Sequence, residues 1–329
     1  MSRTLAVRLE DEADVLLTGP ALRALAATTD ILDVLVSPAG LPAAELLPAV
    51  NEKLTFDPPW RGAAPPQVDR VATDLLIGAL ACRGYDRCVI FTSPGHSPLP
   101  LALLARIAGI GHLVATTTDE PGTLLDVRHE RPPELHEAEV ALDLAYTAGG
   151  RLPTGDDGRL AVRGPLPDVS RRVPDGPYVV LHPGASAPSR ALTPEHAAAV
   201  VAALQEGGRT VVVTGREHEA SLTAAAAGGE AIDLTGRTSF AQLAAVLAHA
   251  ECVVTGSSAP AHLAAAVDTP VVCLASPVVP AARWAPFGVE TVLLGDWQGP
   301  APEHPRLSGV APEKVAEAVA SLVAGRAGA

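Results

Sequence analysis

Three short apolar runs in the second half of the chain each end in a glycine turn, and these turns carry side chains that can bind an anion. The turn residues are small, hydroxyl-bearing or basic: His182, Pro183, Gly184, Arg190, Gly215, Gly256, Ser257, Ser258, Ala259 and His262. In a doubly wound parallel sheet such turns lie at the carboxyl ends of the strands, where backbone N–H groups and helix N-termini favour anionic ligands. The pattern predicts a site for a phosphate-bearing ligand.

Simpler interpretations exist for several of these residues. Thr193 and Pro194 predict a helix that the threonine caps and the proline begins, and Arg190 is then a solvated side chain in the preceding loop. His262 fits equally well as a packed residue in a first helical turn. Glu219 follows the apolar run at 210–213. Its carboxylate can accept hydrogen bonds from ribose hydroxyls, or its charge can simply favour a helix N-terminus.

The first half of the chain contributes one acidic candidate, Asp14. It follows the strand-like run at 5–9 and directly precedes a helical pattern that begins at Val15. An aspartate in this position usually caps a helix. It would also lie at the carboxyl end of the first strand, where a general base can take a proton from an acceptor hydroxyl.

Motifs that would indicate other chemistry are missing from the sequence. It contains no Asp-x-Asp pair, so a divalent ion held by such a motif against a nucleoside diphosphate has no support. No GxGxxG follows the first strand, which argues against a dinucleotide dehydrogenase, and neither GxxxxGK[ST] nor GxSxG occurs.

Strands and helices alternate along the chain, which predicts an α/β protein with parallel sheets. The expected strands of the first half are 4–9, 31–36, 87–91 and 112–116, and its helices are 15–27, 68–82 and 99–107. Residues 41–66 hold six prolines and predict a long irregular excursion. The glycine- and proline-rich stretch 149–177 predicts a linker. After it the strands at 178–181, 210–213 and 252–254 restart the alternation.

These patterns predict two Rossmann-like, doubly wound domains that face each other across a cleft. The expected boundaries are 1–170 for the first domain and 171–310 for the second. A last helix within 311–329 is predicted to cross back to the first domain. A length of 329 residues suffices for two such domains.

Composition narrows the function classes further. The net charge of -13 argues against an extended basic surface and therefore against a nucleic-acid partner. The four cysteines are widely spaced, as expected of thiols in a reducing compartment. No signal peptide or membrane span is recognisable, so we expect a cytoplasmic protein without stable membrane insertion.

The chain resembles the heptosyltransferase-like inverting glycosyltransferases of family 9, which have the GT-B fold. The segments that carry the resemblance are His182 to Ala185, Arg190 with Thr193 to Glu195, Gly215 to Glu219, Leu234 to Thr238 with Leu243, Pro260 to Ala266, and Thr269 to Val272. Near the amino terminus, Asp14 to Thr18 with Pro20 to Leu22 is similar to the opening turn of the family, and Ser93 to Pro98 is similar to a segment of some members.

The resemblance implies roles for particular residues. Asp14 matches the base that deprotonates the acceptor hydroxyl, and Arg190 matches a cation at the donor diphosphate. Glu219 matches an acidic residue that holds the donor ribose, and His262 closes the diphosphate-binding turn. The other turn residues listed first fall in the donor site, and Ser93, His96 and Ser97 fall where the acceptor is expected. The first domain would bind the acceptor and the second the nucleotide-sugar donor, with no cofactor and no essential metal.

The predicted function is therefore inverting transfer of a sugar, by family default a heptose from ADP-heptose, to the hydroxyl of a glycan or small metabolite. The chain departs from the family at Ser257-Ser258-Ala259, where Asp-Thr-Gly is usual. That departure motivates one alternative, a sugar-nucleotide binding protein without transferase activity. A sugar-nucleotide epimerase on a similar two-domain fold is the other.

Overall fold

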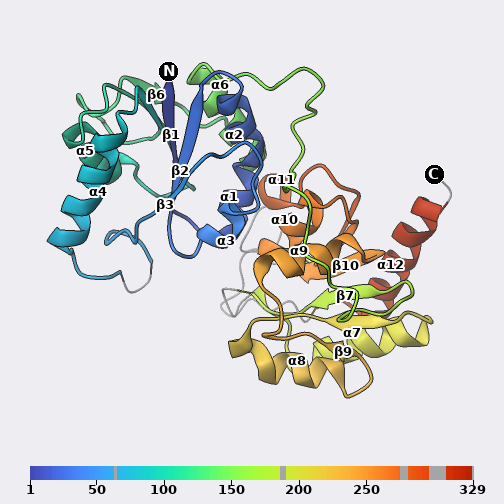
Figure 1. Cartoon of the computed structure of the whole chain (residues 1–329). Coiled ribbons are helices and arrows are strands. Elements are labelled where there is room, and N and C mark those ends of the chain that lie inside the picture. Colours follow the sequence, from blue (N-terminus) through green and yellow to red (C-terminus); the bar gives the residue numbers. More distant parts are fainter. Residues whose placement is uncertain (63–64, 186–189, 275–280, 296–308, 328–329) are drawn as a thin grey trace. The chain divides into compact units, whose positions relative to one another are not determined.

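The chain forms two compact units, Met1–Val162 and Arg163–Ala329, seen in a computed structural model (Figure 1). The structure describes residues 1–62, 65–185, 190–274, 281–295 and 309–327. Because parallel strands need helical crossovers between them, the alternation predicted from sequence produces a doubly wound sheet in each unit. The α/β fold with two Rossmann-like units agrees with the prediction.

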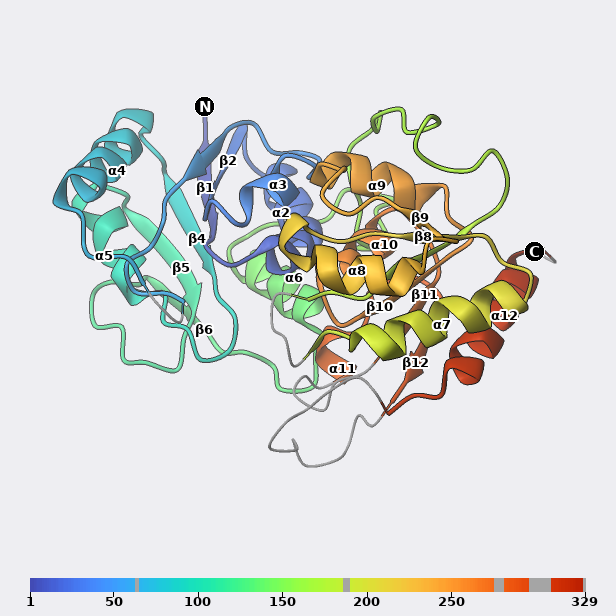
Figure 2. The ribbon, with the colours of Figure 1, turned by 90° about the horizontal axis from the view of Figure 1, so that it is seen from below.

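The first unit contains a six-stranded parallel sheet in the order β3-β2-β1-β4-β5-β6. Its strands are β1 Arg3–Arg8, β2 Ile31–Val36, β3 Lys53–Thr55, β4 Arg87–Phe91, β5 His112–Thr116 and β6 Val127–His129. Its helices are α1 Glu12–Leu17, α2 Gly19–Ala26, α3 Leu41–Ala44, α4 Arg70–Arg83, α5 Leu99–Ile107 and α6 Glu137–Thr147. Helices α4 and α5 cover one face, and α1, α2 and α6 cover the other (Figures 1 and 2).

The second unit repeats this arrangement with the order β12-β11-β10-β7-β8-β9. Its strands are β7 Val179–His182, β8 Val211–Val213, β9 Ile232–Asp233, β10 Cys252–Gly256, β11 Val271–Leu274 and β12 Thr291–Leu294. Its helices are α7 Pro194–Glu206, the 3₁₀ turn η2 Glu217–Glu219, α8 Ala220–Ala227, α9 Phe240–Ala248, α10 Ala259–Ala266, α11 Ala281–Trp284 and α12 Pro312–Ala327. Helices α7 and α8 lie on one face of the sheet, and α9 and α10 lie on the other (Figure 1).

In both sheets the order in which successive strands are added reverses at the first strand. In the first unit β2 and β3 extend to one side of β1, while β4 to β6 extend to the other, and β7 has the same position in the second unit. The loops that leave the carboxyl ends of the two central strands then diverge to opposite faces and leave room between them for a ligand. Ligands are therefore expected at the carboxyl ends of two central strand pairs, β1 and β4 in the first sheet and β7 and β10 in the second. We call these places the β1/β4 edge and the β7/β10 edge.

Three segments differ in detail from the prediction. The helix expected over 15–27 is two helices, α1 and α2, because Pro20 lacks the N–H that a continuous helix needs. The excursion at 41–66 contains the short helix α3 and the edge strand β3. The units divide after Val162, within the linker predicted from the glycines and prolines.

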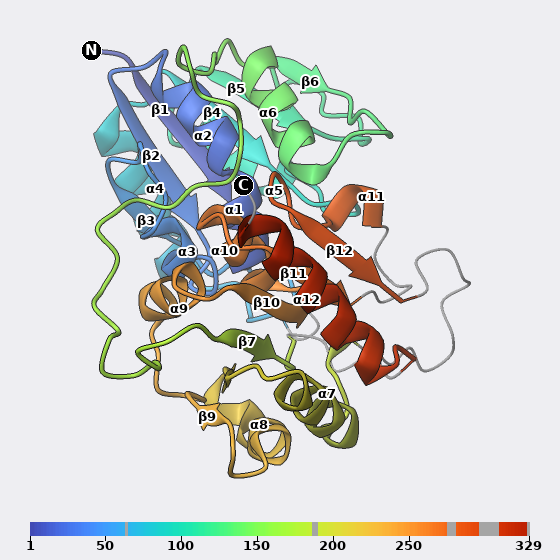
Figure 3. The same ribbon diagram turned by 90° about the vertical axis from the view of Figure 1, so that its right-hand side faces the viewer.

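The last helix packs within the second unit. Val315, Val319 and Leu322 of α12 are buried in the same apolar cluster as Val200 and Leu204 of α7. Figures 2 and 3 show α12, coloured red, beside α7. A stripe at this spacing needs an apolar partner, and α7 supplies it. Among the described helices, none is both long enough and apolar enough to span a membrane.

Candidate active site

Asp14 lies at the β1/β4 switch point of the first unit and is 8% exposed. Its Oδ1 accepts a hydrogen bond from the Ser93 hydroxyl at 2.6 Å and pairs with an Nη2 proton of Arg8. Arg8 Nη2 also donates to Ser93 Oγ at 2.7 Å. No described residue donates a hydrogen bond to Oδ2 of Asp14. One carboxylate oxygen is thus fixed from two sides, while the other is left to accept a proton.

The simpler alternative for Asp14, that it caps a helix, is wrong, because Asp11 is the N-cap of α1. Asp11 Oδ1 accepts hydrogen bonds from the backbone N–H groups of Ala13 and Asp14, at 3.0 and 3.4 Å. Helix α1 therefore starts at Glu12, and Asp14 lies within its first turn. This register releases the Asp14 carboxylate from capping and directs it toward Arg8 and Ser93.

Arg8 joins two carboxylates in a buried cluster. Its Nε lies 3.2 Å from Glu10 Oε2, and the side chains of both residues are at most 6% exposed. Burial alone would lower the pKa of Arg8, but the charges of Glu10 and Asp14 outweigh burial and raise it. Burial likewise opposes ionisation of Glu10, but Arg8, His96 and Arg61 hold its pKa at about 2. Glu10 is therefore a carboxylate at neutral pH.

The segment from Thr92 to Pro98 connects this cluster to a pocket. His96 Nδ1 lies 3.3 Å from Glu10 Oε1, and the backbone N–H of Ser93 donates to the same oxygen at 3.3 Å. Ser97 points elsewhere, since its hydroxyl donates to Asp119 at 2.6 Å. Of the three residues predicted to bind an acceptor, Ser93 and His96 join the Asp14 cluster, and His96 and Ser97 line the pocket.

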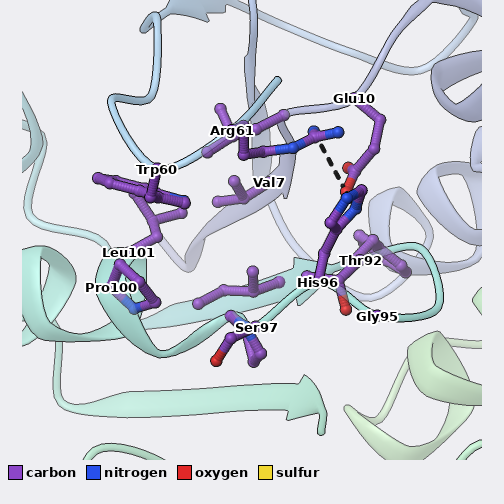
Figure 4. A pocket seen from close by; sticks show the side chains of 14 residues that line it. Val7, Glu10, Trp60, Arg61, Thr92, Gly95, His96, Ser97, Pro100 and Leu101 are labelled. Atoms are coloured by element: carbon purple, nitrogen blue, oxygen red, sulfur yellow. Dashed lines mark hydrogen bonds and ion pairs between the residues drawn. The ribbon is translucent and has the colours of Figure 1, made fainter. Parts of the chain in front are cut away.

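The pocket has a volume of about 170 Å³ and an apolar wall (Figure 4). Val7, Leu9 and Ile90 at the ends of β1 and β4 line it, with Trp60, Pro100 and Leu101. Its polar side is formed by Glu10, Arg61 and His96, and Arg61 Nη1 lies 3.2 Å from Glu10 Oε1. Figure 4 shows Trp60, Pro100 and Leu101 across the pocket from Glu10 and His96.

In the second unit the ends of β7 and β8 meet through His182. Its Nδ1 lies 3.0 Å from Thr214 Oγ1, and its Nε2 lies 4.0 Å from Glu219 Oε2. Burial is the main reason why the pKa of His182 falls to about 4. The negative charge of Glu219 raises this pKa, and the positive charge of Arg216 lowers it. The imidazole is therefore neutral at pH 7 and links two strand ends through its hydrogen bond.

Glu219 packs directly against two glycine turns. Its Oε2 accepts a hydrogen bond from the backbone N–H of Arg216 at 2.7 Å, so the carboxylate caps the η2 turn. A Cβ atom at Gly184 would lie 2.0 Å from Glu219 Oε1, and one at Gly215 would lie 3.3 Å from Oε2. Glu219 therefore stabilises the start of a helical segment, as one interpretation of the sequence predicted. It also lies beside the turns after β7 and β8, where the other interpretation expects it.

The turn after β10 leads into α10 at the switch point. Gly256 ends β10, and Ser258 is the N-cap residue of α10, with its hydroxyl 3.3 Å from Thr255 Oγ1. Arg190 Nη1 donates to the carbonyl oxygen of Ser257 at 3.5 Å, which places the guanidinium at the start of α10. This arrangement places a cation at the positive end of a helix dipole. In the first turn of α10, Pro260 has no N–H and the N–H of Ala261 donates to the Ser258 carbonyl at 3.0 Å.

His262 is 1% exposed on the first turns of α10, and its ring lies 6.4 Å from that of Trp284 in α11. As predicted, Thr193 caps α7 by accepting a hydrogen bond from the N–H of His196 at 3.2 Å. Pro183 contributes its carbonyl oxygen, which accepts a hydrogen bond from the N–H of Leu192 at 2.9 Å. Ala259 is the first residue of α10.

The structure thus gathers the predicted donor-site residues around the β7/β10 edge and places Asp14 with Ser93 and His96 at the β1/β4 edge. Sequence reasoning missed Arg8, Glu10, Trp60 and Arg61. One signal was available for Arg8, because a charge at the end of a buried apolar strand needs a partner. Within the described residues, no group of three or more His, Cys, Asp or Glu side chains is arranged to hold a metal ion.

Two sheets of one topology, each with polar groups at its switch point, define the two-domain GT-B architecture of sugar transferases. A model of glycosyltransferase family 9 (heptosyltransferase) matches residues 89–308, which is more than half of the chain. The chain therefore belongs to glycosyltransferase family 9, and the enzyme is a glycosyltransferase. A comparison with curated proteins gave no match.

Solved structures share the fold over the full length. The family 9 glycosyl transferase from Veillonella parvula is 16% identical, with a TM-score of 0.82 and 98% of each chain covered. The E. coli ADP-heptose lps heptosyltransferase II is 21% identical, with a TM-score of 0.77, over 99% of this chain and 100% of that one. E. coli heptosyltransferase WaaC, solved with ADP, is 19% identical, with a TM-score of 0.70, over 97% and 99%.

Proposed function

We propose that the protein transfers a sugar from a nucleoside diphosphate donor to an acceptor hydroxyl, with inversion at the anomeric carbon and Asp14 as general base. The observation that carries this proposal is the asymmetry of the Asp14 carboxylate. Arg8 and Ser93 hold Oδ1, whereas no described residue donates to Oδ2. A base must be oriented and still have an oxygen free to take the proton, and this carboxylate meets both conditions.

The second unit supplies the groups that a nucleoside diphosphate needs. Arg190 at the start of α10 and the backbone N–H groups after Gly256 can bind the two phosphates, since a charged donor to an anionic oxygen makes a strong hydrogen bond. Glu219 lies beside the turns at Gly184 and Gly215, where its carboxylate can accept hydrogen bonds from ribose hydroxyls. The ADP bound by WaaC is consistent with such a ligand.

The proposed reaction proceeds in one displacement. The acceptor oxygen attacks the anomeric carbon as its proton passes to Asp14 Oδ2, and the bond from the anomeric carbon to the diphosphate oxygen breaks. Negative charge then grows on the departing nucleoside diphosphate, and stabilising that charge is the main electrostatic task. We propose that Arg190 and the backbone N–H groups after Gly256 perform it without a metal ion. Attack from the face opposite the leaving group inverts the anomeric configuration.

The test compares two variants with a panel of ADP-, UDP- and GDP-sugars that includes ADP-heptose. Asp14→Asn should lower kcat by about 10²–10⁴-fold and leave the Kd of the nucleoside diphosphate unchanged. Arg190→Met should instead raise that Kd by roughly ten- to a hundredfold, because a hydrogen bond to a charged group contributes about 1.5–3 kcal/mol. The anomeric configuration of the product, read by NMR, tests inversion.

Asp30→Asn is the matched control. Asp30 is an exposed aspartate at the opposite end of the same sheet from Asp14, and its carboxylate accepts hydrogen bonds from the N–H and hydroxyl of Ser2. Its kcat should equal that of the unmodified enzyme. Undiminished turnover in Asp14→Asn would remove Asp14 from the role of base. Addition of EDTA should leave the rate unchanged, and a rate that EDTA abolishes and Mg²⁺ restores would refute the metal-free reaction.

A further inference from the structure

The pocket in the first unit has the chemistry of a site for an apolar ring. Trp60, Leu101 and Pro100 face the ends of β1 and β4, where Val7 and Ile90 complete the apolar wall. The indole of Trp60 is held in place by Phe56, whose ring lies 5.8 Å away at an angle of 44°. Phe56 is itself buried at 7% exposure. The wall is thus a fixed surface anchored to the core of the unit.

Size limits what this pocket can hold. A cavity of about 150 Å³ lined by apolar side chains admits a benzene molecule. The volume of about 170 Å³ found here corresponds to one six-membered ring or a branched alkyl group of similar bulk. An extended saccharide would place hydroxyl groups against Trp60, Leu101 and Pro100 with nothing to pair them, and each such group costs free energy.

Two side chains that line the pocket have buried polar atoms without a hydrogen bond within the described residues: Arg61, at Nε and Nη1, and Glu10, at Oε2. Arg61 Nε is buried and makes no hydrogen bond within the described residues, while Arg61 Nη1 is 3.2 Å from Glu10. An unpaired buried donor is unfavourable, so a ligand atom that accepts a hydrogen bond there would be stabilising. His96 is the second polar neighbour; its Nδ1 faces Glu10, which leaves Nε2 for a ligand.

The pocket is also connected to Asp14 through a short segment. Thr92 and His96 line the pocket, while Ser93 between them donates to Asp14. Glu10 borders the pocket and shares Arg8 with Asp14. A molecule in the pocket would therefore lie next to the residues that hold the proposed base.

We infer that this pocket binds the apolar ring of a small acceptor alcohol, with a hydrogen-bond-accepting group of that molecule at Arg61. Binding in the pocket is inferred from its apolar wall, its volume and the buried Arg61 donor. The role of the bound alcohol as acceptor rests on the proposed function. The acceptor class is accordingly a compact amphiphile with one ring, and the ring is the part that the enzyme recognises.

The experiment measures binding of 4-fluorobenzyl alcohol to the full-length protein by ¹⁹F NMR, without any donor. Trp60→Ala should weaken binding about tenfold, because it removes an aromatic wall and its buried area. Ser97→Phe adds bulk at an exposed residue that lines the pocket and should weaken binding at least as much. Tyr146→Ala is the control, because Tyr146 is an exposed aromatic residue of α6 outside the pocket. Thermal melts establish that each variant folds.

Wild-type binding that both pocket variants weaken and the control preserves supports the inference. Absence of binding at millimolar alcohol, or an affinity in Trp60→Ala and Ser97→Phe equal to that of the unmodified protein, overturns it. A separate arm measures transfer of sugar to any acceptor and its loss in Asp14→Asn. If that transfer occurs while the alcohol does not bind, the inference fails and the proposed function stands. If the alcohol binds in a Trp60-dependent way but no donor is consumed, the pocket stands and the proposed function fails.

Discussion

At the scale of single residues, Arg8 decides the electrostatics of the first-unit site. It is a buried cation at the end of a central strand, and it pairs with Glu10 and Asp14 at once. Two carboxylates this close would repel each other in a medium of low polarity, so the guanidinium between them is what makes their burial tolerable. Its fork of several N–H groups can hold both carboxylates, which a lysine cannot do equally well.

Replacing Arg8 should therefore be costly. Arg8→Met is expected to lower the free energy of unfolding by about 3–5 kcal/mol, because buried Asp14 loses its counter-charge and Glu10 keeps only Arg61 as an arginine partner. Arg8→Lys should recover part of this loss. Arg70→Met is the control, since Arg70 and Asp74 form an exposed pair whose contribution is about 0–1 kcal/mol. Chemical denaturation measures all three, and equal losses for Arg8→Met and Arg70→Met would contradict the account.

His182 makes a residue-scale prediction about pH. Its pKa is about 4 in the folded protein and 6.5 in an exposed histidine, so between these values the unfolded chain binds more protons than the folded one. Stability is then lost as the pH falls from 6.5 to 4, by up to about 3 kcal/mol. Above pH 6.5 this contribution is fully present.

The measurement is the unfolding free energy as a function of pH for the unmodified protein and for His182→Gln. The glutamine variant should lose less stability across this window, because it has no group to protonate there. His249→Gln, a change at an exposed histidine that ends α9, serves as control and should follow the unmodified protein. Parallel curves for the unmodified protein and His182→Gln would show that His182 does not carry the effect.

At the scale of elements, the second-unit site depends on close approach between a turn and a helical segment. The Glu219 carboxylate occupies the space where a Cβ of residue 184 would be, at 2.0 Å. Only glycine permits the turn after β7 to approach η2 so closely. The same carboxylate caps η2, so the position of the turn and the start of α8 are coupled.

Gly184→Ala should consequently displace Glu219 and lower the free energy of unfolding by about 1–3 kcal/mol, as overpacking does elsewhere. Nucleotide affinity should fall with it. Adding Glu219→Ala removes the clashing atoms, so the double variant should be less destabilised than the sum of the single variants. Gly176→Ala is the matched control, because a Cβ there meets no atom within 4 Å. Strictly additive free energies would refute the contact.

At the scale of the whole molecule, the two units repeat one topology and divide the proposed work. Each has its own six-stranded sheet with the same order of strands about its first strand. Each also has its own buried core, with one apolar cluster in the first unit and another in the second. Such independence predicts that a nucleotide stabilises only the unit that binds it.

Hydrogen exchange with and without ADP tests this division. Protection is expected in the second unit around His182, Glu219 and His262, because a ligand that binds the native state suppresses local opening there. The β1/β4 edge around Asp14 should exchange at the same rate in both conditions. Protection confined to the first unit would reverse the assignment of donor and acceptor.

The sequence by itself determined the elements, because apolar periodicity and turn residues are local signals. The strands at 31–36, 87–91 and 112–116 and the helix at 99–107 are found where predicted. The N-cap Thr193 and the glycine turns followed from the same kind of signal. Together with the family resemblance, these elements indicated the α/β class, the two units and the donor-site turns.

Only the tertiary structure decided which side chains meet. Asp14 and Ser93 are separated by 79 positions and meet because β1 pairs with β4, which also brings Ser93 to Arg8. The order of strands in a sheet is a non-local property, so no local pattern reveals these partners or the pocket beside Trp60. The choice between Asp11 and Asp14 as helix cap was likewise decided by how α1 packs, since either aspartate satisfies the local rule.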